Sequence, residues 1–291
     1  MACGHASSSR LASAAGWAAR YPRSKSGRAT ALSASTAGPR VAIQGELGSF
    51  SHEAAIRLFG KDLDLVACET FPDVFRAAGR HGADFAVLPV ENALYGSIHQ
   101  NYDLLVEHRP DIWAEIRLRI ELCLVGRIAG PVRRGGRVLV HPVAQGQCTA
   151  FLRRHRLEPV PAHDTAGAIR LLVEGADCDY AIASRLAART HGARVLARGI
   201  EDDPRNFTRF LAFSAAGRRK DPFPGRGGPW KTSLAFVLPN RPGTLFKALG
   251  AFALRDIDLA KIESRPIRGR PFEYLFYLDA AGSLDEPPLA K

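Results

Sequence analysis

The chain has 291 residues, of which 46% are apolar, and it carries a net charge of +11, so it is long enough for more than one domain. Six of its lysines and arginines lie in residues 1–40, a segment without Asp or Glu. No basic stripe with interleaved aromatic residues follows, and we expect no nucleic-acid partner. The five cysteines form no CxxC pair and the nine histidines no HExxH motif, so neither a disulfide framework nor a metal site is predicted.

The first 39 residues are predicted to be a disordered transit peptide outside the fold. They are acid-free and rich in Ser, Ala and Arg, which is typical of organelle targeting. The dominance of Ser and Ala favours the plastid, that is the chloroplast stroma, over the mitochondrion. The segment has no long apolar run, so we expect neither a secretory signal nor a membrane association. A disordered basic tail or a misassigned start codon are the alternatives.

Residues 40–214 alternate short apolar runs with helical patterns. Strands are expected at 41–43, 63–68, 85–90, 137–140, 180–183 and 210–213, with helices after most of them. Residues 116–125 read as one long extended stretch that crosses into a second lobe. This order predicts an α/β fold of two lobes with parallel sheets, helices on both faces and a cleft between the lobes.

Polar groups follow several of these strands at the point where a helix begins. The segments are 44–51, 91–98, 141–142 and 206–210. Ser49 or Ser51 is expected to cap the first helix, and Asp164 or Thr165 a later one. In open α/β sheets ligands bind at such strand ends, and helix N-termini attract anions. The sequence therefore predicts a site for a small anionic molecule, although each segment alone reads equally well as an ordinary turn.

Residues 215–230 are rich in Gly, Pro, Lys and Arg and are predicted to be a linker. Residues 231–291 then give a β-α-β-β order that suggests a small ferredoxin-like α+β domain. The domain is predicted to be C-terminally incomplete, because residues 280–291 leave no room for a second helix and a fourth strand.

Together these segments resemble the prephenate/arogenate dehydratase family, in which an ACT regulatory domain follows a two-lobed, periplasmic-binding-protein-like catalytic domain. The matching motifs are Gln44-Gly45 with Gly48-Ser49-Phe50-Ser51, Val90-Glu91-Asn92 with Gly96-Ser97-Ile98, Asn101-Tyr102-Asp103-Leu104-Leu105, His141-Pro142 with Gln147-Cys148, Asp164-Thr165-Ala166-Gly167, Thr208-Arg209-Phe210 and Glu263-Ser264-Arg265-Pro266. The form of the third motif looks closest to the plant and algal plastid branch.

The resemblance implies a hydro-lyase that needs no cofactor and makes phenylalanine from arogenate by decarboxylative dehydration. It implies Thr208 as the catalytic residue that assists departure of the ring hydroxyl. The expected substrate-binding residues are Asn206, Arg209, Phe210, Asn92, Ser97, Thr165 and Ser49. Arg209 and Asn206 are expected to position Thr208 or hold a carboxylate, and Phe210 to wall the substrate ring.

For the ACT domain the resemblance implies phenylalanine as effector and a homo-oligomer, a dimer or tetramer. The expected effector site is Gly243, Thr244 and Leu245 with Glu263, Ser264, Arg265 and Pro266. Thr244 departs from the alanine usual in the first motif, and Val143 and Gln145 depart from the family's segment after His141-Pro142. Prephenate dehydratase, a catalytically decayed member and a non-catalytic amino-acid-binding regulator are the alternatives.

Overall fold

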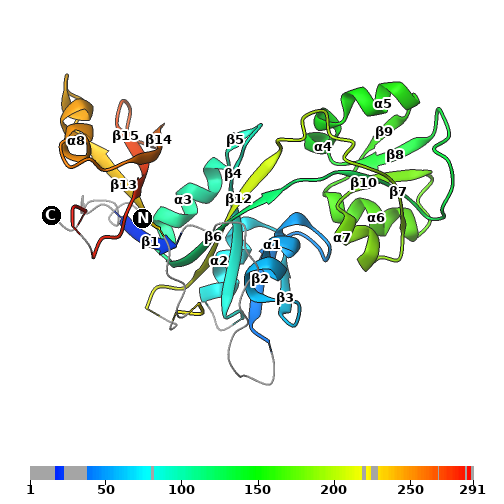
Figure 1. Ribbon diagram of the computed structural model, residues 1–291, viewed down its shortest axis with the longest axis horizontal. Coiled ribbons are helices and arrows are strands. Elements are labelled where there is room, and N and C mark those ends of the chain that lie inside the picture. The colour runs from blue at the N-terminus through cyan, green and yellow to red at the C-terminus, as the bar shows by residue number, and fades with distance from the viewer. Residues whose placement is uncertain are drawn as a thin grey trace, which may run out of the picture. The chain divides into compact units, whose positions relative to one another are not determined.

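A computed structural model describes residues 17–22, 38–79, 82–217, 221–223, 229–267, 269–285 and 287–289. The chain divides into two compact units, a larger one of residues 24–223 and a smaller one that joins residues 1–23 to residues 224–291. Figure 1 shows two separate sheets in the larger unit, each with helices of its own. No helix among these residues is long and apolar enough to cross a membrane.

The first lobe of the larger unit is built on one mixed sheet. Its strands in spatial order are β3 (Asp64–Cys68), β2 (Arg40–Gln44), β4 (Phe85–Asn92), β12 (Phe207–Ser214) and β6 (Asp111–Arg119), with β5 (Gly96–Ser97) paired to the end of β4. Its helices are α1 (Phe50–Phe59), α2 (Phe71–Gly79) and α3 (His99–His108). Helix α1 packs on β2, β4, β6 and β12. Helices α2 and α3 contact each other and also pack on β4. Because three helices cover β4, it is buried over its first six residues.

The second lobe repeats this plan with five strands. They are β11 (Arg194–Arg198), β7 (Cys123–Gly126), β10 (Tyr180–Ala183), β8 (Arg137–Val140) and β9 (Glu158–Pro161) in spatial order. Its helices are α4 (Pro142–Gln147), α5 (Thr149–His155), α6 (Thr165–Val173) and α7 (Arg185–Thr190). Strand β9 was not expected, because it contains two prolines; it lies at the sheet edge, where a missing N–H is tolerated.

The expectation of parallel sheets is correct for only part of each lobe. Strands β2, β3 and β4 are parallel, as are β8, β9 and β10, because a helix connects each to the next. Strand β12 runs antiparallel to both of its neighbours, and β7 does the same in the second lobe. These antiparallel strands belong to the segments that pass from one lobe to the other.

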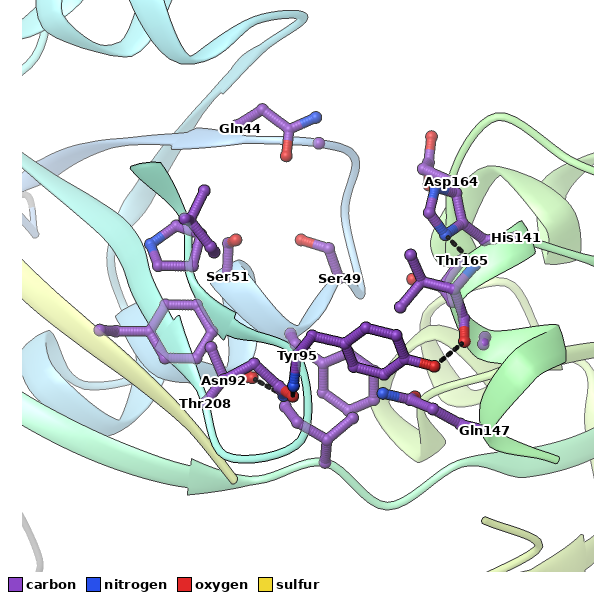
Figure 2. A pocket seen from close by; sticks show the side chains of 18 of the residues that line it. Gln44, Ser49, Ser51, Asn92, Tyr95, His141, Gln147, Asp164, Thr165 and Thr208 are labelled. Carbon is purple, nitrogen blue, oxygen red and sulfur yellow. Dashed lines mark hydrogen bonds between the residues drawn. The ribbon is translucent and has the colours of Figure 1, made fainter. Parts of the chain in front are cut away.

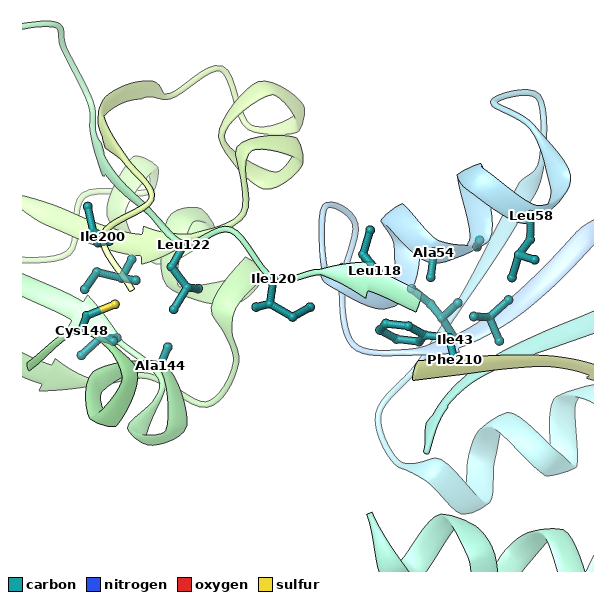
Figure 3. Close-up of a cluster of buried hydrophobic side chains, with 14 of the residues drawn as sticks. Ile43, Ala54, Leu58, Leu118, Ile120, Leu122, Ala144, Cys148, Ile200 and Phe210 are labelled. Atoms are coloured by element: carbon teal, nitrogen blue, oxygen red, sulfur yellow. The ribbon is translucent and has the colours of Figure 1, made fainter. Parts of the chain in front are cut away.

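The predicted single stretch at 116–125 is instead two strands in different sheets. Strand β6 ends at Arg119 and β7 begins at Cys123. Ile120 and Leu122 lie in the connection and are buried, so one apolar core continues from the first lobe into the second, as Figure 3 shows. Glu201 on the returning segment fixes the connection by accepting from Leu122 N and from Arg119 Nη2.

The smaller unit contains an antiparallel sheet and one helix. The helix is α8 (Thr244–Ala253), which begins two residues later than Pro242 suggests. The sheet includes β13 (Trp230–Leu238), β14 (Leu259–Pro266) and β15 (Tyr274–Ala281). No residue of α8 is buried, and Phe246 is 81% exposed.

A fourth strand, β1 (Trp17–Pro22), pairs with β13 along the edge of this sheet. Tyr21 is fully buried and its hydroxyl lies 2.7 Å from Ser233 Oγ. The prediction that residues 1–39 are disordered is therefore wrong for 17–22; the rest of that segment up to residue 37 lies outside the described residues. Local patterns miss such a strand because its hydrogen-bond partner is more than two hundred residues away.

Candidate active site

A cavity of about 400 Å³ lies between the two lobes of the larger unit. The first lobe lines it with strand ends and the start of α1, and the second lobe lines it with the starts of α4 and α6. Figure 2 shows polar side chains facing this space from both sides. The cleft expected from the sequence is therefore present, with many of the predicted residues around it.

Thr208 stands at the centre of a hydrogen-bond network on the first lobe. Asn92 Nδ2 donates to Thr208 Oγ1 at 3.0 Å and to Asn206 Oδ1 at 2.8 Å. The orientation of the Asn92 amide is fixed, because its Oδ1 accepts from the backbone N–H groups of Leu94 and Tyr95. Thr208 Oγ1 is thus an acceptor toward Asn92, which leaves its proton to donate elsewhere.

Asn206 and Arg209 do not line the cavity. Asn206 is fully buried, and Asn92 links it to Thr208 by donating a hydrogen bond to each of them. The Arg209 side chain points to the opposite face of β12, where Nε donates to Glu115 Oε2 at 2.7 Å and Nη1 lies 3.5 Å from Glu91. Successive side chains alternate across a strand, so Thr208 and Phe210 face the cavity and Arg209 does not. Arg209 therefore lies outside the cavity lining, beside the carboxylates of Glu115 and Glu91.

The remaining predicted residues, Ser49, Asn92, Ser97, Thr165 and Phe210, line the cavity. Ser49 caps α1 by accepting from His52 N at 3.2 Å. The preceding loop is held by His52, whose Nδ1 accepts from Gly48 N at 2.9 Å and whose pKa is lowered by burial. The first-turn N–H groups of α1 and its dipole therefore make this side of the cavity attractive to a carboxylate.

The second lobe presents two capped helix starts to the cavity. His141 caps α4 through Nδ1, which accepts from Val143 N, so the neutral ring carries its proton on Nε2. Burial lowers the pKa of His141 and favours this neutral form. Asp164 caps α6, with Oδ1 accepting from Ala166 N and Gly167 N at 2.8 and 2.7 Å.

His141, Gln147 and Tyr95 line the cavity but were not predicted as site residues. Gln147 is buried at the end of α4, where an amide in a short helix gives no local signal of function. His141 and Gln147 did stand in the resembling motif, which could have indicated them. Val143, one of the two departures from that motif, also lines the cavity, whereas Gln145 does not.

The lobes meet directly beside the cavity. Ser184 Oγ donates to Gly48 O at 2.6 Å, and a Cβ built on Gly48 would lie 2.4 Å from Ala187 Cα. Arg170 on α6 donates to both carboxylate oxygens of Glu46, which lowers the pKa of Glu46. Gly48 also has φ of +91°, so glycine is required there both by backbone conformation and by the close approach.

Two cysteines of the second lobe, Cys123 and Cys148, are buried and do not line the cavity. Burial raises the pKa of Cys148 to about 12 and that of Cys123 to about 11. Both thiols therefore stay protonated and behave as small apolar core residues, as their places in the two core clusters indicate. Among the described residues, no group of three His, Cys, Asp or Glu is arranged to hold a metal ion.

The predicted effector residues lie on two segments of the smaller unit. Gly243 precedes α8 with φ of +81°, and no side chain caps that helix. The Thr244 hydroxyl donates to Pro239 O or Arg241 O, each at 2.9 Å. Glu263 to Pro266 form the second half of β14, an edge strand of the sheet, with Ser264 and Pro266 exposed.

Two lobes around a cleft, followed by a small antiparallel α+β unit, define the class of two-lobed small-molecule-binding folds with an appended domain. Residues 41–218 match the prephenate dehydratase family model and residues 232–291 match the ACT domain model. The chain belongs to the prephenate dehydratase family.

The curated relatives include plant proteins. The chain is 42% identical over 255 residues to arogenate dehydratase/prephenate dehydratase 2, chloroplastic, of Arabidopsis thaliana. This alignment covers 84% of this chain and 66% of that protein. It is 43% identical over 260 residues to arogenate dehydratase 2 of Petunia hybrida, covering 84% of this chain and 65% of the relative. The chain thus spans somewhat less than two thirds of the length of these relatives.

Two solved structures share the fold over most of the chain. One is the quorum-quenching acylase GqqA, with a TM-score of 0.77, 33% identity and coverage of 86% of this chain and 90% of that one. The other is prephenate dehydratase from Arthrobacter aurescens in complex with L-Phe, with a TM-score of 0.76, 28% identity and coverage of 86% and 83%.

Proposed function

We propose that this protein is an arogenate dehydratase that forms phenylalanine by decarboxylative dehydration. The single observation that carries the proposal is the hydrogen bond from Asn92 to Thr208 inside the cavity of a chain that belongs to the prephenate dehydratase family. The alternative is prephenate dehydratase activity, which yields phenylpyruvate. The Arabidopsis relative is named for both arogenate dehydratase and prephenate dehydratase activity.

The reaction breaks two bonds on opposite sides of a cyclohexadienol ring. The C–C bond to the ring carboxylate breaks, carbon dioxide leaves, and the electron pair moves through the ring to expel the hydroxyl group, which takes up one proton and leaves as water. Thr208 donates its proton in a hydrogen bond to the departing oxygen, because its own acceptor site is engaged by Asn92. Such a donor stabilises charge that develops only as the C–O bond breaks.

Asn92 and Asn206 act on this step as positioning residues. A freely rotating hydroxyl donates in many directions, whereas Thr208 is held by Asn92, and Asn92 is held by two backbone N–H groups and by Asn206. The network therefore supplies orientation before the substrate arrives. Phe210, next on the cavity face of β12, supplies an apolar wall for the ring.

The carboxylates of the substrate are bound by helix N-termini in this proposal. Within the lining that the structure describes, no residue is lysine or arginine. The starts of α1 and α4 reach the cavity through Ser49 and His141, whereas the first N–H groups of α6 already donate to the Asp164 carboxylate. Backbone N–H groups at the starts of α1 and α4 hold a carboxylate, which was one of the two roles expected of Asn206 and Arg209.

The fold is shared with an acylase, and amide hydrolysis is a second reading that the hydrogen bonds disfavour. A serine or threonine nucleophile needs a base that accepts its proton. Ser49 Oγ accepts from a backbone N–H, and the Nδ1 atoms of His52 and His141 also accept from backbone N–H groups. At Nδ1, neither His52 nor His141 therefore accepts a proton from Ser49.

The smaller unit is proposed to sense phenylalanine through residues 243–245 and 263–266, with the protein acting as a homo-oligomer in the plastid. The uncapped start of α8 favours a carboxylate, the relatives are chloroplastic, and a related prephenate dehydratase was solved with L-Phe. Calorimetric titration with phenylalanine, and with 3-phenylpropionate as a ligand lacking the amino group, tests the effector. Binding of neither would contradict it.

Turnover by the purified full chain tests the activity. Arogenate and prephenate are supplied in parallel, and phenylalanine and phenylpyruvate are separated by chromatography. We expect phenylalanine release from arogenate to be the faster reaction. Faster phenylpyruvate formation would favour the alternative, and binding of arogenate without turnover of either substrate would identify a non-catalytic regulator.

A further inference from the structure

We infer that Asp164 determines substrate class by accepting the ammonium group of an amino-acid substrate. The inference rests on the proposed function and sharpens it, because arogenate and prephenate differ only in carrying an amino or a keto group on the same side chain. Asp164 was predicted from the sequence only as a possible helix cap, and the structure places it in the wall of the cavity.

One carboxylate oxygen of Asp164 is committed to the fold and the other is available. Oδ1 accepts from the backbone N–H groups of Ala166 and Gly167 and begins α6. Among the described residues, none donates a hydrogen bond to Oδ2; His163 Nδ1 lies 4.0 Å away, and its side chain is 84% exposed. The Asp164 side chain keeps 25% of its surface accessible, so an incoming donor can reach it.

The neighbouring backbone leaves this oxygen room. A Cβ built on Gly167 would lie 3.0 Å from Asp164 Oδ2, closer than most side-chain contacts. Glycine at 167 therefore keeps the carboxylate in its present place while Oδ1 caps the helix. The cap fixes the direction of the carboxylate, so Oδ2 is a preorganised acceptor.

The charge of the cavity makes this acceptor selective. Asp164 is the one carboxylate in the lining that the structure describes, and that lining contains no lysine or arginine. A keto acid with two carboxylates brings two negative charges toward Asp164 and nothing to offset them. The amino acid brings one ammonium group that pairs with Asp164 while helix N-termini hold its carboxylates.

The position of Asp164 also matches the shape of the substrate. In Figure 2 Asp164 lies across the cavity from Thr208, on the second lobe. The ring hydroxyl and the alanyl side chain of arogenate lie at opposite ends of the ring. With the hydroxyl at Thr208, the amino group is directed toward the second lobe, where Asp164 stands.

The test is Asp164→Asn, with kcat and KM measured for arogenate and prephenate on the full chain. Asparagine caps helices as well as aspartate, so Oδ1 still begins α6 while the negative charge is removed. We expect kcat/KM for arogenate to fall at least about tenfold, mainly through KM, and that for prephenate to stay or rise. The arogenate-to-prephenate ratio therefore falls.

Asp202→Asn is the matched control. Asp202 caps the start of α5, accepting from Thr149 N and Ala150 N at 3.0 Å each, and it lies outside the cavity lining. The same loss of charge at a helix start there should leave the substrate ratio unchanged.

The outcomes separate the inference from the proposed function. An unchanged ratio in Asp164→Asn, or an equal loss for both substrates, would overturn the role of Asp164 while the wild-type activity stands. A preference of the wild-type protein for prephenate would also overturn the role of Asp164. Wild-type protein that turns over neither substrate would overturn the proposed function itself, and the inference with it.

Discussion

The two lobes of the larger unit contribute to the cavity in different ways. The first lobe presents side chains on strand ends, held by side-chain hydrogen bonds and backed by the buried Arg209–Glu115 pair. The second lobe presents helix starts, each held by one capping residue. In the proposed function, the first lobe therefore holds the Thr208 hydroxyl in place through hydrogen bonds, while the second lobe recognises the charged groups of the substrate.

Removing the ion pair behind β12 should have the largest effect. In Arg209→Met the Glu115 carboxylate, whose side chain is 4% exposed, keeps its burial and loses its partner at 2.7 Å. Removing one partner of a buried ion pair costs roughly 3–5 kcal/mol. We expect chemical denaturation to show a loss of that size.

The control for this change is Arg117→Met. Arg117 lies 3.8 Å from Glu115 and its side chain is 61% exposed, so its removal should cost little. Equal stability losses in the two variants would contradict the buried pair as the support of the first lobe.

Thr208→Val is the next largest change and affects activity. Valine keeps the shape of threonine and removes the hydroxyl that Asn92 orients. We expect kcat to fall about 10²-fold or more with KM for the substrate nearly unchanged. Thr208→Ser should retain much of the activity because it keeps the donor. Wild-type turnover in Thr208→Val would exclude the role assigned to Thr208.

Gly48→Ala should act on the contact between the lobes. Its Cβ would meet Ala187 Cα at 2.4 Å, and the atom it meets is backbone, so the lobes must separate there. We expect KM to rise roughly tenfold, since a wider cleft weakens binding that depends on both lobes.

Gly60→Ala separates this clash from backbone strain. Gly60 has φ of +94°, close to that of Gly48, and a Cβ there meets nothing within 4 Å. It should lose about 1 kcal/mol of stability without a change in KM. A similar KM in the two glycine variants would argue against lobe separation.

The smallest effect concerns the protonation of His52. Its neutral Nδ1 holds the Gly48 loop, and burial lowers its pKa below the ordinary 6.5. A histidine with a lowered folded pKa contributes stability that is present above its unfolded pKa and is lost as the pH falls toward the folded pKa. We expect unfolding free energy to decrease below about pH 6.5, and His52→Gln to show a flatter pH dependence. Identical slopes would exclude His52 as the source.

Local signals predicted the elements of this fold better than their partners. The caps at Ser49 and Asp164 were each one of two predicted candidates, because a cap depends only on the residues beside it. The single stretch at 116–125 was wrong because nothing in an apolar run marks where it leaves one sheet for another.

Within the site, Thr208 was expected in the loop before a strand at 210–213, whereas it lies in β12, and the environment of Arg209 was not predicted. Alternation along β12 places the two side chains on opposite faces, so the sequence did contain a sign that Arg209 points away from the cavity. Its partner Glu115 is 94 residues distant in the chain, and only the fold brings the two together. Gln147 also lines the cavity, and the resembling motif, rather than any local pattern, was the signal that could have indicated it.

Strand β1 gives the smaller unit an unusual order of assembly. Tyr21 and Ser233 are 212 residues apart, so this sheet cannot close until the whole intervening chain has been made. During synthesis β1 therefore stays unpaired until β13 has been made, and without β1 the edge of β13 would be open to other chains. Protease removal of the segment up to Pro22 would leave the same open edge permanently, so the timing of any N-terminal cut also sets the solubility of the finished protein.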